Sequence, residues 1–208
     1  NDGMATELTR GDLSALSIFN TTMDRPFELP LDSEGRRGRA LFEAIGCVEC
    51  HIPVLETNRT TLPYKVTGAP EEPFSDTFFE ADLTRRPARF ERNRTGGIRV
   101  RMFGDLKRHD MGDVLSETSD ALSPQLNREF TTARLWGVAD TAPYIHDGRA
   151  LTIREAIYLH NGPNSEAQDR GAAFMAMSPD DQQAVLRFLG SLRTPVRPNA
   201  DVVPCLLY

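Results

Sequence analysis

The pentapeptide Cys47-Val48-Glu49-Cys50-His51 holds the side chains best suited to carry chemistry in this sequence. Two thiols three residues apart, followed at once by a histidine, are typical of the attachment motif of a c-type haem. Each sulfur would add to one vinyl group of the porphyrin, and the adjacent imidazole would become an axial ligand of the iron. The motif therefore predicts one covalent haem, bound by Cys47 and Cys50 and ligated by His51.

A structural zinc site and a redox-active dithiol are the alternatives for the same motif. Structural zinc needs four ligands, usually in two close pairs, and the one other cysteine, Cys205, stands alone. Thioredoxin-like C-x-x-C motifs follow a strand in a βαβ pattern, and no such pattern precedes Cys47. Both alternatives fit the sequence less well than a haem does.

His160 is the residue that we expect to ligate the iron opposite His51. Ile153, Ala156, Ile157 and His160 share one face at helical spacing, so this imidazole would project from an apolar stripe. A histidine on such a face is more often a hydrogen-bonded core residue. In a chain that already holds a haem, the balance shifts toward an iron ligand.

Other candidate ligands lie in loops of the chain. Met111 is the alternative axial ligand, and a methionine there would raise the reduction potential relative to bis-histidine ligation. His109 is a plausible donor in the same loop, and His146 in a Pro- and Gly-rich loop is expected to be structural, but the roles of both stay open. Arg134, Arg149 and Trp136 lie near the haem motifs in the sequence and are expected to contact the haem, the two arginines by pairing with propionates.

The elements that must position these residues are mainly helices. Helices are expected over residues 9–26, 38–45, 152–161 and 178–195, from their capping residues, apolar spacing and terminal prolines or glycines. Residues 98–103 alternate apolar and basic side chains as a half-buried strand would, and residues 52–95 are expected to be irregular. The fold class expected is mostly α, a cytochrome c-like haem domain with long irregular loops and little β structure.

The helix patterns at the two ends of the chain match without a gap. The matched pairs are Thr9 and Ser178, Asp12 and Asp181, Ala15 and Ala184, Phe19 and Phe188, and Pro26 and Pro195. One interpretation makes residues 1–31 the trailing helix of a preceding haem domain plus a linker, residues 32–195 the haem domain, and residues 196–208 a tail. The other interpretation is two unrelated amphipathic helices.

Composition and charge exclude some classes of function. The formal net charge of −6 argues against nucleic-acid binding. No apolar stretch is long enough to span a bilayer, and the sequence does not begin with a signal peptide. Because covalent haem attachment takes place outside the cytoplasm, we expect a soluble bacterial protein of the periplasm in mature or trimmed form.

Four blocks of the sequence together resemble a known family. They are CVECH (47–51), GDLKRHDMG (104–112), LWGVADTAPYIHDGRA (135–150) and LTIREAIYLH (151–160). They are similar to the C-terminal haem domain of the bacterial di-haem cytochrome c peroxidase superfamily, and most similar to its thiol-oxidoreductase-like branch. The PY-x-HDG block is the specific part, since every c-type cytochrome shares C-x-x-C-H.

The resemblance implies several roles for residues of this chain. In the peroxidases a methionine fourteen residues after the histidine of HDG ligates the haem, and that position here is His160, a departure that implies a lower potential. The backbone carbonyls of Thr141 and Pro143 would help to hold a calcium ion. The family's catalytic haem lies in an N-terminal domain, so no catalytic residue is assigned in this chain.

Three functions remain open at this point. The first is the electron-transfer part of a di-haem peroxidase-class oxidoreductase, which relays electrons from a redox partner protein to a catalytic haem on a missing N-terminal portion. The second is a stand-alone mono-haem, bis-histidine electron carrier. The third is a haem sensor in which a small ligand displaces His160.

Overall fold

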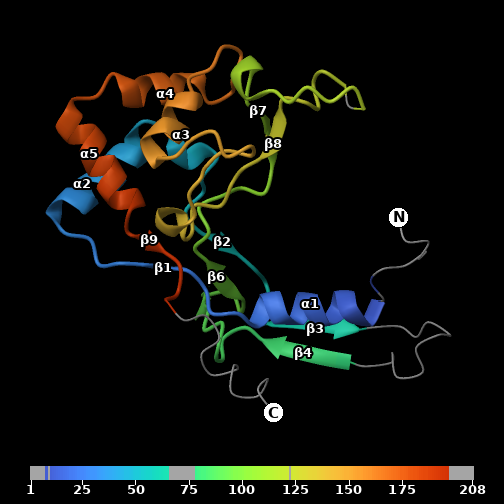
Figure 1. The fold of residues 1–208 in the computed structure, drawn as a ribbon. Coiled ribbons are helices and arrows are strands. Elements are labelled where there is room, and N and C mark those ends of the chain that lie inside the picture. Colours follow the sequence, from blue (N-terminus) through green and yellow to red (C-terminus); the bar gives the residue numbers. More distant parts are fainter. Residues whose placement is uncertain (1–7, 9, 66–77, 122, 197–208) are drawn as a thin grey trace. The chain divides into compact units, whose positions relative to one another are not determined.

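The computed structural model describes residue 8 and residues 10–65, 78–121 and 123–196 (Figure 1). Its α-helices are α1 (Arg10–Thr22), α2 (Ser33–Ala44), α3 (Ile153–Leu159), α4 (Gln168–Met175) and α5 (Pro179–Leu189). Three short 3-10 helices are η1 (Cys47–Glu49), η2 (Asp113–Leu115) and η3 (Val138–Asp140). The strands are β1 (Phe27–Glu28), β2 (Leu55–Glu56), β3 (Thr61–Lys65), β4 (Phe78–Asp82), β5 (Glu91–Arg92), β6 (Ile98–Val100), β7 (Arg108–Asp110), β8 (Glu129–Thr131) and β9 (Leu192–Arg193).

The fold is mixed, so the expectation of a mostly α protein is wrong. Helix accounts for 34% of the structure and strand for 16%, the latter in several small sheets. The error arises largely in residues 52–95, which contain the antiparallel hairpin β3–β4 and two strands of the sheet β2-β6-β5. Strand β3 contains Pro63, a residue type that is rare within strands because it has no amide proton for the ladder. In a two-stranded hairpin, however, both strands are edge strands, and an edge tolerates proline.

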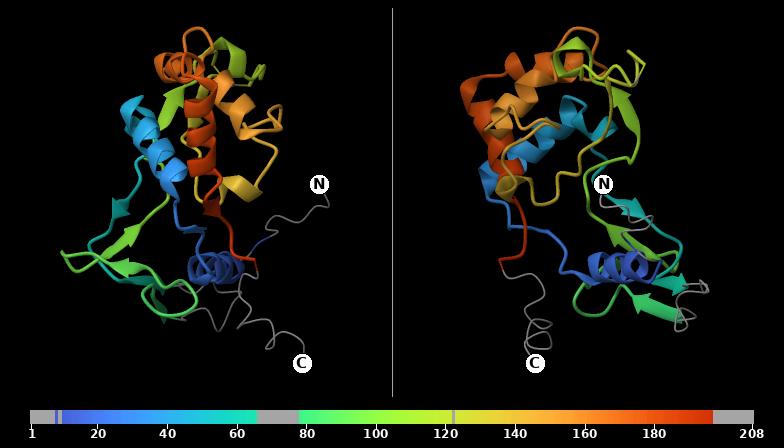
Figure 2. Two further views of the ribbon diagram at one scale, coloured as in Figure 1. Left: turned by 90° about the vertical axis from the view of Figure 1, so that its left-hand side faces the viewer. Right: turned by 45° about the vertical axis from the view of Figure 1, so that its right-hand side comes forward.

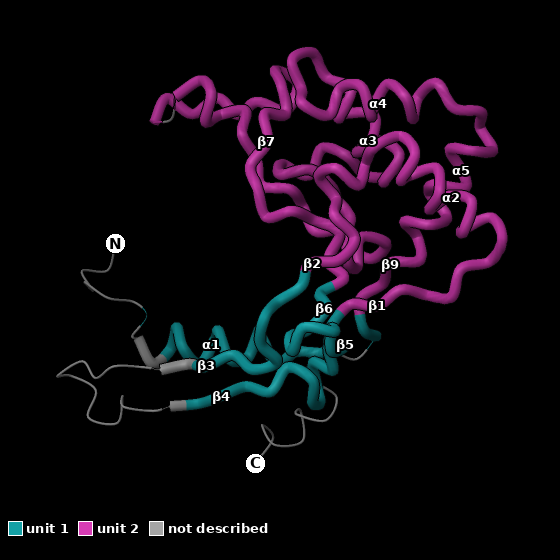
Figure 3. The backbone as a smooth tube through the Cα atoms, turned by 180° about the vertical axis from the view of Figure 1, so that it is seen from behind, with its two compact units in different colours: residues 1–25, 56–100, 195–208 teal, residues 26–55, 101–194 magenta. Residues whose placement is uncertain are grey.

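The chain divides into two compact units (Figure 3). Unit 1 comprises residues 1–25, 56–100 and 195–208, and unit 2 comprises residues 26–55 and 101–194. In unit 1, α1 packs against the β3–β4 hairpin. Leu13, Leu16 and Phe19 of α1 stay exposed by 49%, 51% and 48%. One apolar face of α1 is therefore largely uncovered by the residues that the structure describes.

Unit 2 is organised around α2 and α5, which lie side by side (Figure 2). The Asp32 side chain caps α2 by accepting from the Gly35 amide at 2.8 Å, and Ser178 and Pro179 open α5 as the sequence predicts. The two helices approach closely at Gly38, where a Cβ atom would lie 1.8 Å from the carbonyl oxygen of Ala184. Glycine is required here because any side chain would overlap the backbone of α5.

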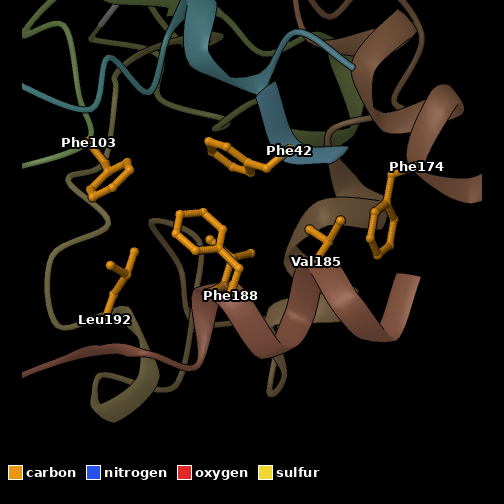
Figure 4. Close-up of a cluster of buried hydrophobic side chains, with 7 residues drawn as sticks. Phe42, Phe103, Phe174, Val185, Phe188 and Leu192 are labelled. Carbon is orange, nitrogen blue, oxygen red and sulfur yellow. The ribbon is translucent and has the colours of Figure 1, made fainter. Parts of the chain in front are cut away.

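The hydrophobic core of unit 2 surrounds Phe188 of α5 (Figure 4). Phe188 has no exposed surface, and its ring packs edge-on against Phe42 of α2 at 5.4 Å and Phe103 at 5.8 Å between centroids. The buried cluster also includes Val185 and Leu189 of α5, Phe174 of α4 and Leu192 of β9. Burying a side chain of this size contributes about 1.5–3 kcal/mol, so these contacts fix α5 against α2 and against the segment that holds Phe103.

Helix α3 begins with the capping box that the sequence predicts. The Thr152 hydroxyl accepts from the Glu155 amide at 3.2 Å, and the Glu155 carboxylate accepts from the Thr152 amide at 3.1 Å. Ile153 and Ile157 pack against the core of unit 2, so the apolar face of α3 points inward. No helix among the described residues is long and apolar enough to cross a lipid bilayer.

Candidate haem site

The C-x-x-C-H motif directly follows α2, whose apolar face is fixed by the core. Gly46 adopts a left-handed backbone conformation with φ of 84°, which lets the chain turn sharply from α2 into η1. Cys47 packs against the core cluster, and burial raises the pKa of its thiol to about 11. Both cysteines of the motif are free thiols. The two thiols thus lie in one turn at the end of a packed helix and are not joined by a disulfide.

His51 is oriented by a backbone carbonyl from a distant segment. Its Nδ1 lies 3.2 Å from the carbonyl oxygen of Phe103, and because a carbonyl can only accept, Nδ1 carries the proton. Desolvation and then the charge of His160 lower the pKa of His51 to about 4. The imidazole is therefore neutral, with its lone pair on Nε2, the form in which histidine binds iron.

His160 is held in the same way at the end of α3. Its Nδ1 donates to the carbonyl oxygen of Ala156 at 2.7 Å, so its lone pair also lies on Nε2. Desolvation lowers its pKa, which keeps the ring neutral. The charge of His160 is the second cause of the lowered pKa of His51. Two neutral imidazoles and two free thiols are the donor types that would hold a c-type haem, and the pairing of His160 with His51 stays a prediction.

Met111 is engaged in a different set of contacts. Its amide donates to the carbonyl oxygen of Arg128 at 2.8 Å, and it forms an isolated antiparallel bridge with Ser165. No interaction between Met111 and His51 is found among the described residues. The backbone of Met111 is thus held against Arg128 and Ser165, and its role as the alternative axial ligand stays a prediction.

The remaining predicted site residues lie in the segment around η3. Arg134 is exposed and Trp136 is half-buried. Arg149 is held by protein partners, the Asp147 carboxylate at 2.5 Å and the carbonyl oxygen of Val114 at 2.7 Å. Haem contacts of Arg134, Trp136 and Arg149 stay predictions.

Thr141 and Pro143, the expected calcium ligands, are exposed residues that follow η3. Within the described ranges, no three His, Cys, Asp or Glu side chains gather in a way that could hold a metal ion. That search concerns side chains only, so calcium binding by the backbone carbonyls of Thr141 and Pro143 stays a prediction. Cys205 lies outside the described residues.

Sequence reasoning left His146 open, and the structure gives it a packing role. Its ring stacks on Phe130 of β8 with centroids 4.1 Å apart and an interplanar angle of 18°. Its Nε2 lies 3.8 Å from a carboxylate oxygen of Glu117. His146 therefore holds the loop of the HDG block against β8.

His109 is the functional candidate that sequence reasoning did not resolve. Its Nε2 lies 2.8 Å from Asp105 Oδ2 and its Nδ1 lies 2.8 Å from Glu166 Oε2. The same Nδ1 is 4.0 Å from the sulfur of Cys50. Asp105 stands four residues before His109, a spacing visible in the sequence, whereas Glu166 is 57 residues away and no local signal connects the two.

Comparison with known proteins places the chain in a family. A family model described as "Di-haem oxidoreductase, putative peroxidase" matches residues 76–192, and the chain belongs to this family. The match confirms the resemblance noted from the sequence, and it includes His109, His146 and His160. The C-x-x-C-H motif lies before the matched residues.

A named relative extends this finding. Cytochrome-c peroxidase IdrP2 of Pseudomonas sp. (strain SCT) is 25% identical over 206 residues, which cover 87% of this chain and 50% of the relative. The chain therefore spans about half the length of the curated relative that it matches. No solved structure matches the chain.

Proposed function

We propose that this chain is a c-type haem electron-transfer domain of a di-haem, peroxidase-class oxidoreductase. In this role it would take electrons from a redox partner protein and pass them to a catalytic haem on a preceding portion of the enzyme. The haem would be a single one, joined covalently to Cys47 and Cys50. When bound, it supplies one-electron chemistry at the iron.

One observation carries the proposal. His51 and His160 each give their Nδ1 proton to a backbone carbonyl, so each ring has its lone pair on Nε2, the atom that would bind the iron. Two strong axial ligands leave no vacant position for peroxide, and such a site suits electron transfer rather than reaction with a substrate. The rigid supports of both rings, the Phe103 segment and the capped helix α3, keep the ligands in place through a change of oxidation state.

The spectrum of the haem-loaded chain tests this assignment. The wild-type ferric protein should be low-spin and should not react rapidly with hydrogen peroxide. His160→Ala should convert the absorption and electron paramagnetic resonance spectra to high-spin, because it opens one axial position. His146→Ala, which removes a histidine stacked on Phe130, is the matched control and should stay low-spin. A low-spin spectrum in His160→Ala would move the ligand role to Met111 or His109.

Three features support a second haem domain as the partner. The relative has about twice the length of this chain, and the family is named for two haems although the sequence has one C-x-x-C-H motif. The exposed apolar face of α1, with Leu16 and Phe19, matches in sequence the face of α5 that is buried through Val185 and Phe188. We propose that residues 1–31 belong to a preceding haem domain, that residues 32–195 form the present one and that residues 196–208 are a tail.

A stand-alone bis-histidine electron carrier is the second candidate, favoured by the single C-x-x-C-H motif. A haem-stained denaturing gel with intact masses, run on protein from the native source, separates the two. A longer species with two haems, or a second haem-bearing chain, supports the di-haem enzyme. A single species with the mass of this chain plus one haem supports the carrier. For either function we propose a periplasmic location, since covalent haem attachment takes place outside the cytoplasm. Calcium binding at Thr141 and Pro143 stays a prediction.

A further inference from the structure

His109 lies between two carboxylates on the haem-attachment side of unit 2. Each ring nitrogen is 2.8 Å from a carboxylate oxygen, Nε2 from Asp105 and Nδ1 from Glu166. Carboxylates at both nitrogens favour the doubly protonated ring, which can donate to both. The pKa of His109 is raised, since burial would lower it but the hydrogen bonds to Glu166 and Asp105 outweigh burial. The three side chains therefore form one ionic network with a net charge of −1.

The network is built into the fold rather than placed on the surface. The Asp105 side chain is only 2% exposed. Burial would raise its pKa, but hydrogen bonds from the Lys107 amide and from His109 outweigh burial and lower it. Glu166 is fixed through its other oxygen, which accepts from the Asp110 amide at 3.0 Å. Asp105 thus remains ionised although it is almost fully enclosed.

The network lies beside the sulfur of Cys50. His109 Nδ1 lies 4.0 Å from Cys50 Sγ. The His109 ring is in turn hydrogen-bonded to Asp105 and Glu166, so all three members of the network are joined at the residue next to this sulfur.

The network is linked through the chain to the segments that carry both proposed iron ligands. Asp105 follows Phe103, whose carbonyl orients His51, by two residues. Glu166 lies in the loop that follows α3, six residues after His160. The hydrogen bonds of His109 to Asp105 and Glu166 therefore join these two segments.

We propose that Asp105, His109 and Glu166 set the reduction potential of the iron held by His51 and His160, with their net negative charge stabilising the ferric state. The proposal rests on the proposed function, because it needs a haem joined to Cys50. Reduction adds one electron and lowers the positive charge at the iron, so a fixed negative charge nearby favours the oxidised form. His109 offsets one of the two carboxylates and keeps the potential from falling further.

Reduction potentials of the haem-loaded wild type and four variants, measured by spectroelectrochemistry at pH 7, test the proposal. Glu166→Gln removes a negative charge and should shift the midpoint potential upward. His109→Gln removes a positive charge and should shift it downward. His109→Lys keeps the positive charge and should return the potential close to that of the wild type. Asp180→Asn, at the exposed start of α5, removes a carboxylate outside the network and should leave the potential unchanged.

Opposite shifts in Glu166→Gln and His109→Gln would support the proposal, because loosened packing would affect both variants in the same direction. Shifts of the same sign, or equal potentials in His109→Gln and His109→Lys, would overturn it. Loss of haem loading in these variants with normal loading of the wild type would also overturn it, since the network would then be structural. A wild-type chain without covalent haem would instead refute the proposed function itself.

Discussion

Gly38→Ala should destabilise the protein because α2 and α5 touch through their backbones at this position. The added methyl group would lie 1.8 Å from the carbonyl oxygen of Ala184 and 2.3 Å from its carbonyl carbon. To restore a contact of 3.4 Å, the helices would have to separate locally by about 1.6 Å, a gap large enough to forfeit much of the dispersion energy of the atoms between them. A backbone carbonyl in a helix cannot rotate out of the way.

The size of the effect follows from two opposing contributions. Overpacking of a well-packed interior costs about 1–3 kcal/mol, and a clash with backbone should lie at the upper end. Replacing glycine by alanine inside a helix returns about 1 kcal/mol through helix propensity. We therefore expect a net loss of about 2 kcal/mol in the free energy of unfolding.

Gly35→Ala in the same helix is the matched control. The nearest atom to its added methyl group is the terminal Cδ2 of Leu31, at 3.0 Å, which can move aside. This variant should be unchanged or more stable by up to about 1 kcal/mol, the difference in helix propensity. Urea unfolding of the haem-loaded proteins, followed by circular dichroism, measures both. Equal stability of the two variants would refute the close-contact reasoning.

Two further predictions concern the helix termini and are measured by the same unfolding assay. Thr152→Ala should cost about 1 kcal/mol because it removes the cap of α3, whereas Thr152→Ser should retain most of that stability, and an equal loss in both would argue against capping. The hydrogen bond from Arg187 is the main reason that the pKa of Asp32 falls from 3.8 to about 2, so the folded state is stabilised above pH 3.8 and this contribution is lost as the pH falls toward 2. Asp32→Asn keeps a capping side chain but removes the charge. The free energy of unfolding of this variant should be lower than that of the wild type at pH 7, and the difference should disappear near pH 2. A difference that does not depend on pH would contradict this account.

The helices of unit 2 could be predicted from the sequence because their signals are local. Ser178 with Pro179 and Thr152 with Glu155 mark helix starts within four residues of sequence, and the structure confirms both. The strands of residues 52–95 could not be predicted in the same way. The pairing of Thr61 with Asp82 is set by contacts across 21 residues, and the proline within β3 hides the strand pattern.

In the candidate site too, features with a local sequence signal could be predicted and contacts between distant residues could not. Cys47, Cys50 and His51 are legible as a motif, and the apolar spacing before His160 suggested its inward direction. The carbonyl of Phe103 that orients His51 leaves no trace in the sequence, because every residue has a carbonyl. The ionic partner of His109 was hidden as well, since Glu166 joins it only through the folding of the loop after α3.

A backbone hydrogen bond, 3.0 Å long, joins the Gly104 amide to the Ile52 carbonyl just after the C-x-x-C-H motif. It closes a long excursion of the chain, which includes residues 56–100 of unit 1. Because doubling the length of a loop costs only about 0.6 kcal/mol in closure entropy, evolution can lengthen, shorten or replace this excursion cheaply. His51 directly precedes Ile52 and its acceptor Phe103 directly precedes Gly104, so a change in the length of this excursion would leave the contact between His51 and Phe103 in place.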